Sequence, residues 1–400
     1  MTDPNGNLTE KATDKGLATE YVYNKAGFIT SMKNMKNDTV NDSYKCRYYQ
    51  NGMKISEEST HIGPDNVQQN SLYKTYYYDD LGRLKVEFAV QNNNAFYNST
   101  YSYDLRGNRI SSYISKDNSV GTEVNYTYDL NDRLAESTFE DRIFGETDTT
   151  TGGTHYRYDN NGNMLSEQKY TYGEGEVSST MSVVGGGSEP KLKIYNYDAF
   201  NQLTSYYDAG AVASYTYNAD GLRVSKTVNG NRTAFTWNGQ NLACEVNGDS
   251  INTYTYDVTG ISSAVINGVY RTYMKDTHGS VVGYYNANGE RMTQYEYDAF
   301  GNRLKGSDPD PFGYCGEYYD SESGNIYLRA RYYNSTTGRF ISEDPAKDGV
   351  NWYVYCGGNP VMLVDPWGLR PGDLIESSLE GLSEQSINNI NLALEERRKG

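Results

Sequence analysis

Residues with chemical potential are few in this sequence, and most stand far apart. The three histidines form no HExxH zinc motif, and no P-loop, GxSxG nucleophile elbow or EF-hand loop is present. Near the C-terminus two aspartates, Asp344 and Asp365, each precede a proline, Pro345 and Pro366. On its own an Asp-Pro pair is a turn signal. The isolated residues therefore predict no cofactor, no metal and no catalytic centre.

Composition indicates an all-β chain that is not an ordinary globular protein. Tyrosine occurs 41 times and glycine 40 times, so tyrosine supplies much of the apolar surface. Tyrosine, threonine and valine favour strands, whereas glycine, asparagine and aspartate favour tight turns. The net charge of −16 disfavours nucleic acid and anionic membranes as partners. No apolar run approaches the roughly 18 residues of a membrane span.

The ends and the cysteines give less information. The polar N-terminus, Met-Thr-Asp-Pro-Asn-Gly-Asn, is unlike a signal peptide, and we expect the chain to begin inside a longer array. The four cysteines are scattered, without zinc spacing or the density of a disulfide scaffold. One disulfide bridge and buried free thiols are both compatible with this pattern.

A repeat organises most of the chain. Its unit is Tyr-x-Tyr-Asp-x-x-Gly-Asn/Arg-x-Leu, and such self-similarity is typical of repeat architectures. Clear copies begin at Tyr76, Tyr101, Tyr126, Tyr156, Tyr195, Tyr215, Tyr254 and Tyr295. Degenerate copies begin at Tyr21, Phe235 and Tyr273.

Each unit predicts one β-hairpin. Tyr-x-Tyr places two rings on the same face of a strand, because side chains alternate along it. The following Asp or Asn starts a turn, and the glycine suits a position with positive φ. A single hairpin cannot bury its own face, so we expect the hairpins to stack into a long curled sheet, a partial β-shell.

Two alternatives concern this repeat region. The tyrosines could form a carbohydrate- or nucleic-acid-stacking surface, but their fixed register favours a structural role. Residues 141–154 and 172–190, rich in Gly, Ser, Thr and Glu, interrupt the pattern, and we predict that both are long loops projecting from hairpins.

From about residue 311 the sequence changes character. The segments GEYYD, YLRARYYN, TGRFISEDP and GNPVMLVDPWGL follow one another. This stretch resembles the Rhs repeat-associated core, which closes the shell of bacterial Rhs proteins and of the C subunits of insecticidal toxin complexes. The upstream tyrosine-aspartate (YD) repeats extend the resemblance over nearly the whole chain. The wall-associated proteins of Gram-positive bacteria and, more distantly, the teneurins are similar.

The resemblance implies a self-cleaving cassette. In such proteins the core is an aspartyl autoprotease that cuts after the leucine of DPxGL. Carried over to this chain, the acidic pair is Asp344 and Asp365, with Arg331 supporting them. The implied scissile bond joins Leu369 to Arg370. Two carboxylates sharing a site cannot both ionise cheaply, so one would hold a proton while the other activates water.

Further residues of these motifs are expected to support the site. Arg339 is the alternative partner for a carboxylate, and Trp367 is expected to pack near the cut. Pro345, Pro366 and Gly368 are expected to shape the backbone.

Three regions follow from these observations. Residues 1–310 form the YD-repeat shell, residues 311–369 the autoprotease cassette, and residues 370–400 the start of a variable toxin region. Apolar residues at helical spacing between positions 379 and 394 predict a short α-helical tail. The tail is short for a nuclease or deaminase and lacks histidine and cysteine.

Two classes of function remain. The first is a secreted, toxin-encapsulating shell used in interbacterial competition, which releases its C-terminal cargo once by self-cleavage. Its partners would be that cargo and an immunity protein. The second is a cell-surface or cell-wall structural or adhesion module without catalysis, with glycans as partners. The intact cassette favours the first, and the missing toxin sequence favours the second. Either setting is outside the cell, with the export signal outside this chain.

Overall fold

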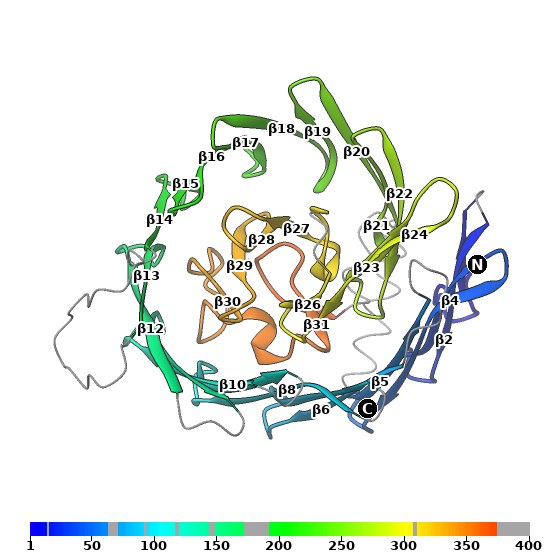
Figure 1. The fold of residues 1–400 in the computed structure, drawn as a ribbon, viewed down its shortest axis with the longest axis horizontal. Coiled ribbons are helices and arrows are strands. Elements are labelled where there is room, and N and C mark those ends of the chain that lie inside the picture. The colour runs from blue at the N-terminus through cyan, green and yellow to red at the C-terminus, as the bar shows by residue number, and fades with distance from the viewer. Residues whose placement is uncertain are drawn as a thin grey trace.

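One antiparallel sheet of 24 strands dominates the fold. The computed structural model describes residues 1–13, 16–62, 71–91, 94–116, 120–143, 149–171, 192–306 and 310–373. Each strand pairs with the next one in the chain, so the sheet is a continuous meander. Figure 1 shows that this meander curls into a ring around residues 310–373. The fold is therefore all-β, as the sequence predicts.

The wall of the ring consists of strands β1 to β24. Their bounds are β1 Glu10–Ala12, β2 Leu17–Tyr23, β3 Ile29–Lys36, β4 Thr39–Tyr48, β5 Lys54–His61, β6 Leu72–Tyr78, β7 Leu84–Gln91, β8 Asn94–Tyr103, β9 Arg109–Lys116, β10 Val120–Tyr128, β11 Leu134–Ile143, β12 Thr149–Tyr158, β13 Met164–Thr171, β14 Leu192–Tyr197, β15 Leu203–Tyr207, β16 Val212–Tyr217, β17 Arg223–Val228, β18 Asn231–Asn238, β19 Asn241–Asn247, β20 Ser250–Asp257, β21 Gly260–Ile266, β22 Val269–Lys275, β23 Val281–Tyr285 and β24 Arg291–Gln294.

Smaller elements follow the wall. They are β25 Glu296–Tyr297, β26 Arg303–Lys305, the 3-10 helix η1 Tyr314–Gly316, β27 Tyr318–Asp320, β28 Asn325–Leu328, β29 Arg331–Asn334, β30 Arg339–Phe340, the 3-10 helix η2 Tyr355–Gly358, β31 Leu363–Val364 and β32 Gly372–Asp373. Strands β27 to β30 form a four-stranded sheet, and β31 pairs with β32. The predicted helical tail lies outside the described residues.

The turn of each repeat is built as its sequence predicts. At Asp79 the carboxylate accepts the backbone N–H groups of Leu81 (3.0 Å) and Arg83 (2.9 Å). Gly82, at φ +78°, donates its N–H to the Asp79 carbonyl at 2.9 Å. This conformation favours glycine because a side chain there is strained. The same pair of side-chain bonds recurs at Asp104, Asp129, Asp198 and Asn218.

The two tyrosines of a repeat share the inner face but differ in role. Tyr76 is buried and Tyr77 is exposed, as the strand alternation requires. The second tyrosine, Tyr78, donates its hydroxyl to the backbone carbonyl of Lys54 in the preceding hairpin at 2.8 Å. Equivalent bonds come from Tyr48, Tyr103, Tyr128 and Tyr217, and from the Trp237 indole. In these repeats the second ring thus fastens its hairpin to the preceding one.

One predicted loop is largely strand. Residues 141–154 were expected to project as a long loop, but β11 continues to Ile143 and β12 begins at Thr149. The glycines that suggested a loop serve packing instead. A Cβ atom on Gly152 would lie 2.8 Å from the Phe139 ring. Residues 172–190 lie outside the described residues.

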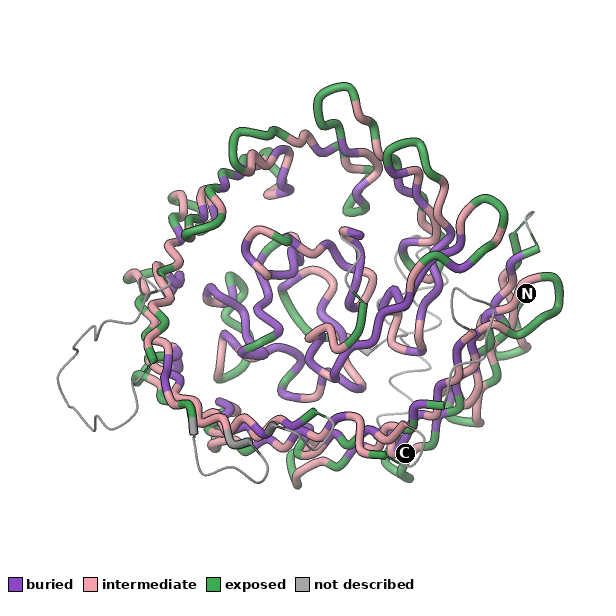
Figure 2. The backbone as a smooth tube through the Cα atoms, in the orientation of Figure 1, coloured by how far each residue is buried: buried purple, intermediate pink, exposed green. Residues whose placement is uncertain are grey.

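The residues from 310 to 373, which we call the plug, lie inside the ring (Figure 1). Figure 2 shows that much of the plug is buried. Wall rings Tyr195, Tyr215 and Tyr254 share one apolar core with plug rings Tyr327 and Tyr332. Such aromatic contacts bury large areas and fix orientation.

The ring is not closed by backbone pairing. Among the described residues no strand pair joins β24 to the first strands. Side chains bridge this seam instead. Asn34 donates to the Lys275 carbonyl at 3.0 Å, and Lys36 donates to the Gly289 carbonyl at 2.8 Å. This agrees with the long curled sheet, a partial β-shell, that the sequence predicts.

A buried histidine belongs to the same seam. His61 Nδ1 lies 2.8 Å from Asp42 Oδ1, and its Nε2 lies 3.3 Å from Glu296 Oε1. Arg291 is also paired with Asp42. Burial opposes a charge on His61, yet the two carboxylates raise its pKa to about 9. The protonated imidazole therefore joins β5 to the end of the wall.

We expect this histidine to make stability depend on pH. Because its pKa is raised, the stabilisation is complete below the unfolded value near 6.5 and is lost as the pH rises through about 9. The shift corresponds to roughly 3 kcal/mol. Urea unfolding at about pH 6 and about pH 10 should show a smaller difference for His61→Gln than for the wild type. The half-exposed His155→Gln serves as control. Equal pH dependence in all three chains would contradict this role.

All four cysteines are free thiols. In the part of the chain that the structure describes, no helix is long and apolar enough to cross a bilayer.

Candidate functional site

The structure brings three of the predicted site residues together. Arg331 opens β29, Asp344 follows β30, and Asp365 follows β31. Arg331 Nη2 lies 3.9 Å from Asp344 Oδ1 and 3.6 Å from Asp365 Oδ2. All three side chains are buried. Two carboxylates therefore face one guanidinium inside the plug.

Arg331 is held on several sides. Its Nη1 donates to the Trp352 carbonyl at 2.9 Å, and its Nε donates to the Gly368 carbonyl. The guanidinium carbon lies 3.6 Å from the centre of the Phe340 ring. Burial lowers the pKa of Arg331 to about 10, although both aspartates favour its charged form. The side chain still carries its charge at neutral pH and is fixed in one orientation.

Asp344 is oriented by the backbone that follows it. Its Oδ1 accepts the N–H of Ala346 at 2.9 Å, and its Oδ2 accepts the N–H of Asp348 at 3.3 Å. The Asp344 amide itself donates to the Trp352 carbonyl at 3.1 Å. Pro345, for which we predict a backbone-shaping role, lies within this turn.

Asp365 has a different environment. Its Oδ1 accepts the N–H of Leu369 at 3.1 Å. Burial raises the pKa of Asp365, against the influence of Arg331 and of the N–H groups of Leu369, Arg370 and Gly368. Its Oδ2 is buried and accepts no hydrogen bond from the described residues. A carboxyl group of this kind is suited to hold a proton.

The predicted scissile bond lies in a short closed loop. Strands β31 and β32 pair through Leu363↔Asp373 and Val364↔Gly372, and residues 365–371 connect them. The loop contains Asp365 and the Leu369–Arg370 bond. Leu369 is partly exposed. One carboxylate of the pair therefore lies next to the backbone that the sequence marks for cutting.

The remaining predicted residues have various positions. Arg339, the alternative carboxylate partner, instead reaches the wall, where it donates to Asn108 Oδ1 (2.9 Å) and to the Asp132 carbonyl (2.5 Å). Trp367 is half-buried, two residues before Leu369.

Three contributors to the site were not predicted. The Phe340 ring packs against the Arg331 guanidinium, and the Trp352 carbonyl accepts hydrogen bonds from both Arg331 and Asp344. Cys356 is buried, which raises the pKa of its thiol, and the nearby Asp365 carboxylate raises it further. The TGRFISEDP segment could have pointed to Phe340, because that residue lies within it. The sequence could not have pointed to the Trp352 carbonyl, because every residue has a backbone carbonyl.

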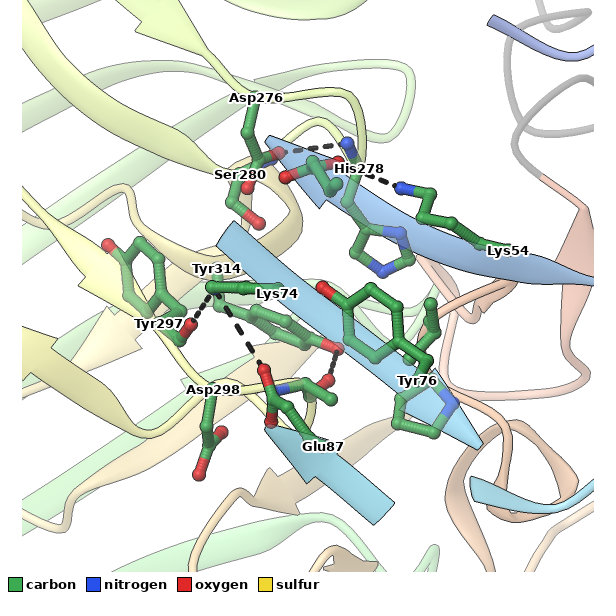
Figure 3. A pocket seen from close by; sticks show the side chains of 14 residues that line it. Lys54, Lys74, Tyr76, Glu87, Asp276, His278, Ser280, Tyr297, Asp298 and Tyr314 are labelled. Carbon is green, nitrogen blue, oxygen red and sulfur yellow. Dashed lines mark hydrogen bonds and ion pairs between the residues drawn. The ribbon is translucent and has the colours of Figure 1, made fainter. Parts of the chain in front are cut away.

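A second polar cluster lines a small cavity between β5 to β7 of the wall and the plug (Figure 3). The cavity volume is about 40 Å³, which is enough for roughly three water molecules. Lys54 donates to Glu57 at 3.0 Å, and Lys74 lies 3.9 Å from Glu87. Burial, with both lysines adding, lowers the pKa of His278 to about 3. Each lysine has a carboxylate partner, and further bonds run from Lys54 to Thr277 and from Lys74 to the Tyr297 carbonyl, so the cluster joins β5–β7 to the end of the repeat region.

Metal chemistry finds no support in the donor sets. The described part of the chain holds no group of three or more His, Cys, Asp or Glu side chains placed to bind a metal ion.

A curled sheet of YD hairpins around a plug defines a YD-repeat shell protein of the Rhs type. The family model of the teneurin YD shell matches residues 46–353, and the chain belongs to this family. The match includes Arg331 and Asp344, whereas Asp365 lies beyond it.

Individual relatives are much longer than this chain. The tRNA3(Ser)-specific nuclease WapA of Bacillus spizizenii is 33% identical over 278 residues, covering 62% of this chain and 11% of the relative. Double-stranded DNA deaminase toxin A of Burkholderia cenocepacia is 24% identical over 350 residues, covering 78% of this chain and 23% of the relative. A crystal structure of TcdB2-TccC3 without its hypervariable C-terminal region is 19% identical with a TM-score of 0.46, covering 92% of this chain and 21% of that one.

Proposed function

We propose that this chain is part of a toxin-enclosing shell whose plug is an aspartyl autoprotease that cuts once, between Leu369 and Arg370. The observation that carries the proposal is the convergence of Asp344 and Asp365 on Arg331, beside the backbone of residues 368 and 369. Two carboxylates at one cation, one of them with a raised pKa, are what acid-base hydrolysis of a peptide requires.

The two carboxylates would take different parts in the reaction. Asp365, buried and with an oxygen free of hydrogen bonds, holds the proton and polarises the Leu369 carbonyl. Asp344, oriented by two backbone N–H groups, takes a proton from the attacking water. The water oxygen bonds to the Leu369 carbon, the bond to the Arg370 nitrogen breaks, and that nitrogen leaves as an amine after receiving from Asp344 the proton that the water gave up. Arg331 balances the negative charge throughout.

The regions would then divide the work. Residues 1–310 form the container, residues 311–369 the autoprotease, and residues 370–400 the start of the cargo. The two relatives carry different activities in their names, yet each matches most of this chain over a minor part of its own length. This supports a shell that is independent of the cargo's activity. We place the protein outside the producing cell, secreted or on the wall, in competition between bacteria, with an immunity protein as partner of the cargo.

The intact mass of the purified chain tests the proposal. We expect two polypeptides, one ending at Leu369 and one beginning at Arg370, which remain together under native conditions and separate in denaturant. Sequencing of the new N-terminus identifies the bond. A chain that stays full length after prolonged native incubation would contradict the autoprotease and favour a non-catalytic adhesion or glycan-binding module.

A further inference from the structure

The turn between β28 and β29, residues 328–331, faces the peptide that leads to the proposed cut. Three successive residues of this turn donate hydrogen bonds to three successive carbonyls of that peptide. The bonds run from Arg329 Nη1 to Pro366 (2.8 Å), from the Ala330 amide to Trp367 (3.2 Å) and from Arg331 Nε to Gly368. The loop is thus held by its backbone carbonyls at three successive residues.

The close fit at Gly368 supports this view. Gly368 has φ +64°, and a Cβ atom there would lie 2.7 Å from the Leu328 carbonyl oxygen and 3.0 Å from the Arg331 nitrogen. Those neighbours are backbone atoms, which cannot move aside cheaply. The turn therefore accepts only glycine at this position, one residue before the leucine.

Arg329 has no part in the proposed reaction steps, yet its backbone and its contacts are unusual. It adopts φ +57°, a region that non-glycine residues seldom occupy and that is often retained for function. Its guanidinium is paired with Glu317, and both side chains are mostly buried. The guanidinium carbon lies 5.4 Å from the centre of the Trp367 ring, within cation–π range. One side chain therefore contacts both a carbonyl and an aromatic ring of the same peptide.

We propose that residues 328–331 are the substrate-binding cradle of the self-cleavage, and that Arg329 is a positioning residue that recognises the Pro366 carbonyl and the Trp367 ring. This assignment rests on the proposed autoprotease. Arg329 makes its contacts two and three residues before the cut, so it acts by placing the Leu369 carbonyl against the two aspartates. Small misplacements of a reacting group lower rates strongly.

The test compares Arg329→Met with the wild type in the full chain. Both are made by cell-free synthesis, and the full-length fraction is followed over time. We expect Arg329→Met to slow cleavage roughly 10- to 100-fold. Arg329→Lys, which keeps a charge and a donor, should recover part of the rate. Arg271→Met is the matched control, because it removes a similarly buried arginine-carboxylate pair, with Asp310, away from this peptide.

A second measurement separates positioning from general destabilisation. In an Asp344→Asn background, Arg329→Met should raise amide hydrogen exchange in residues 367–369 at least about 10-fold and leave β29 and β30 unchanged. Unchanged exchange in 367–369, or a variant that cleaves at the wild-type rate, would overturn the cradle alone. A wild type that is never cut would overturn the autoprotease and the cradle together.

Discussion

Asp344→Asn and Asp365→Asn chains are expected to stay full length where the wild type is cut. Each substitution removes a group able to transfer a proton, and such groups contribute roughly 10²- to 10⁴-fold to rate. Burial already favours the neutral form of Asp365, so an amide at this position should leave the plug intact. Intact mass after timed incubation measures the loss, and thermal melting checks the fold.

A control for these variants exists within the repeats. Asp198→Asn changes the same chemical group at a turn whose side-chain bonds go to Phe200 and Gln202 of the turn itself, and Asn24 and Asn218 serve that position in other repeats. It should be cut at the wild-type rate.

The raised pKa of Asp365 also predicts how the cleavage rate depends on pH. Cleavage should slow as the pH rises, because that carboxyl group then loses its proton. Normal cleavage in either Asp→Asn variant of the cassette would remove that residue from the mechanism.

The second large effect concerns how the plug is held. Arg223 of β17 forms two bonds to Asp320 of β27, at 2.5 and 3.0 Å, and both side chains are almost completely buried. Five aromatic rings surround the guanidinium. Asp320→Ala leaves this cation without its bidentate partner, which in buried pairs costs about 3–5 kcal/mol. We expect a lower urea midpoint and faster proteolysis of the plug.

The reverse experiment separates charge from packing. Arg223→Met combined with Asp320→Leu replaces the pair by apolar groups and should recover much of the stability, because Lys226, which also pairs with Asp320, still has Glu322 as a partner at 3.1 Å. Replacing Glu58, whose pair with Lys45 is exposed, should change little. An Asp320→Ala chain as stable as the wild type would show that the aromatic contacts alone hold the plug.

Structural features are predictable from this sequence when the residues that form them lie close together in the chain. The turns at Asp79 and Gly82 follow from their own repeat, because carboxylate and amide are two to four residues apart. The alternation of Tyr76 and Tyr77 follows from strand geometry. The loop prediction for residues 141–154 was wrong because glycine is not only a loop residue. It also occurs in strands where a neighbouring ring, here that of Phe139, leaves no room for a side chain.

Contacts between distant segments were hidden. Arg223 pairs with Asp320, and His61 pairs with Glu296. The partners lie far apart in the sequence, and no local pattern marks any of them. The acidic pair was predictable only through its resemblance to the Rhs core. The part played by Arg329 required seeing the turn and the peptide side by side.

The short ladder between β31 and β32 bears on what happens after the cut. Once the bond to Arg370 is broken, Leu363–Val364 and Gly372–Asp373 belong to two separate molecules held by two residue pairs. A contact so small is weak in dilute solution. Within an enclosed space the severed strand stays at a high effective concentration and rebinds readily. Bond breaking and departure are then separate events, and the rate of delivery would be set by opening of the container.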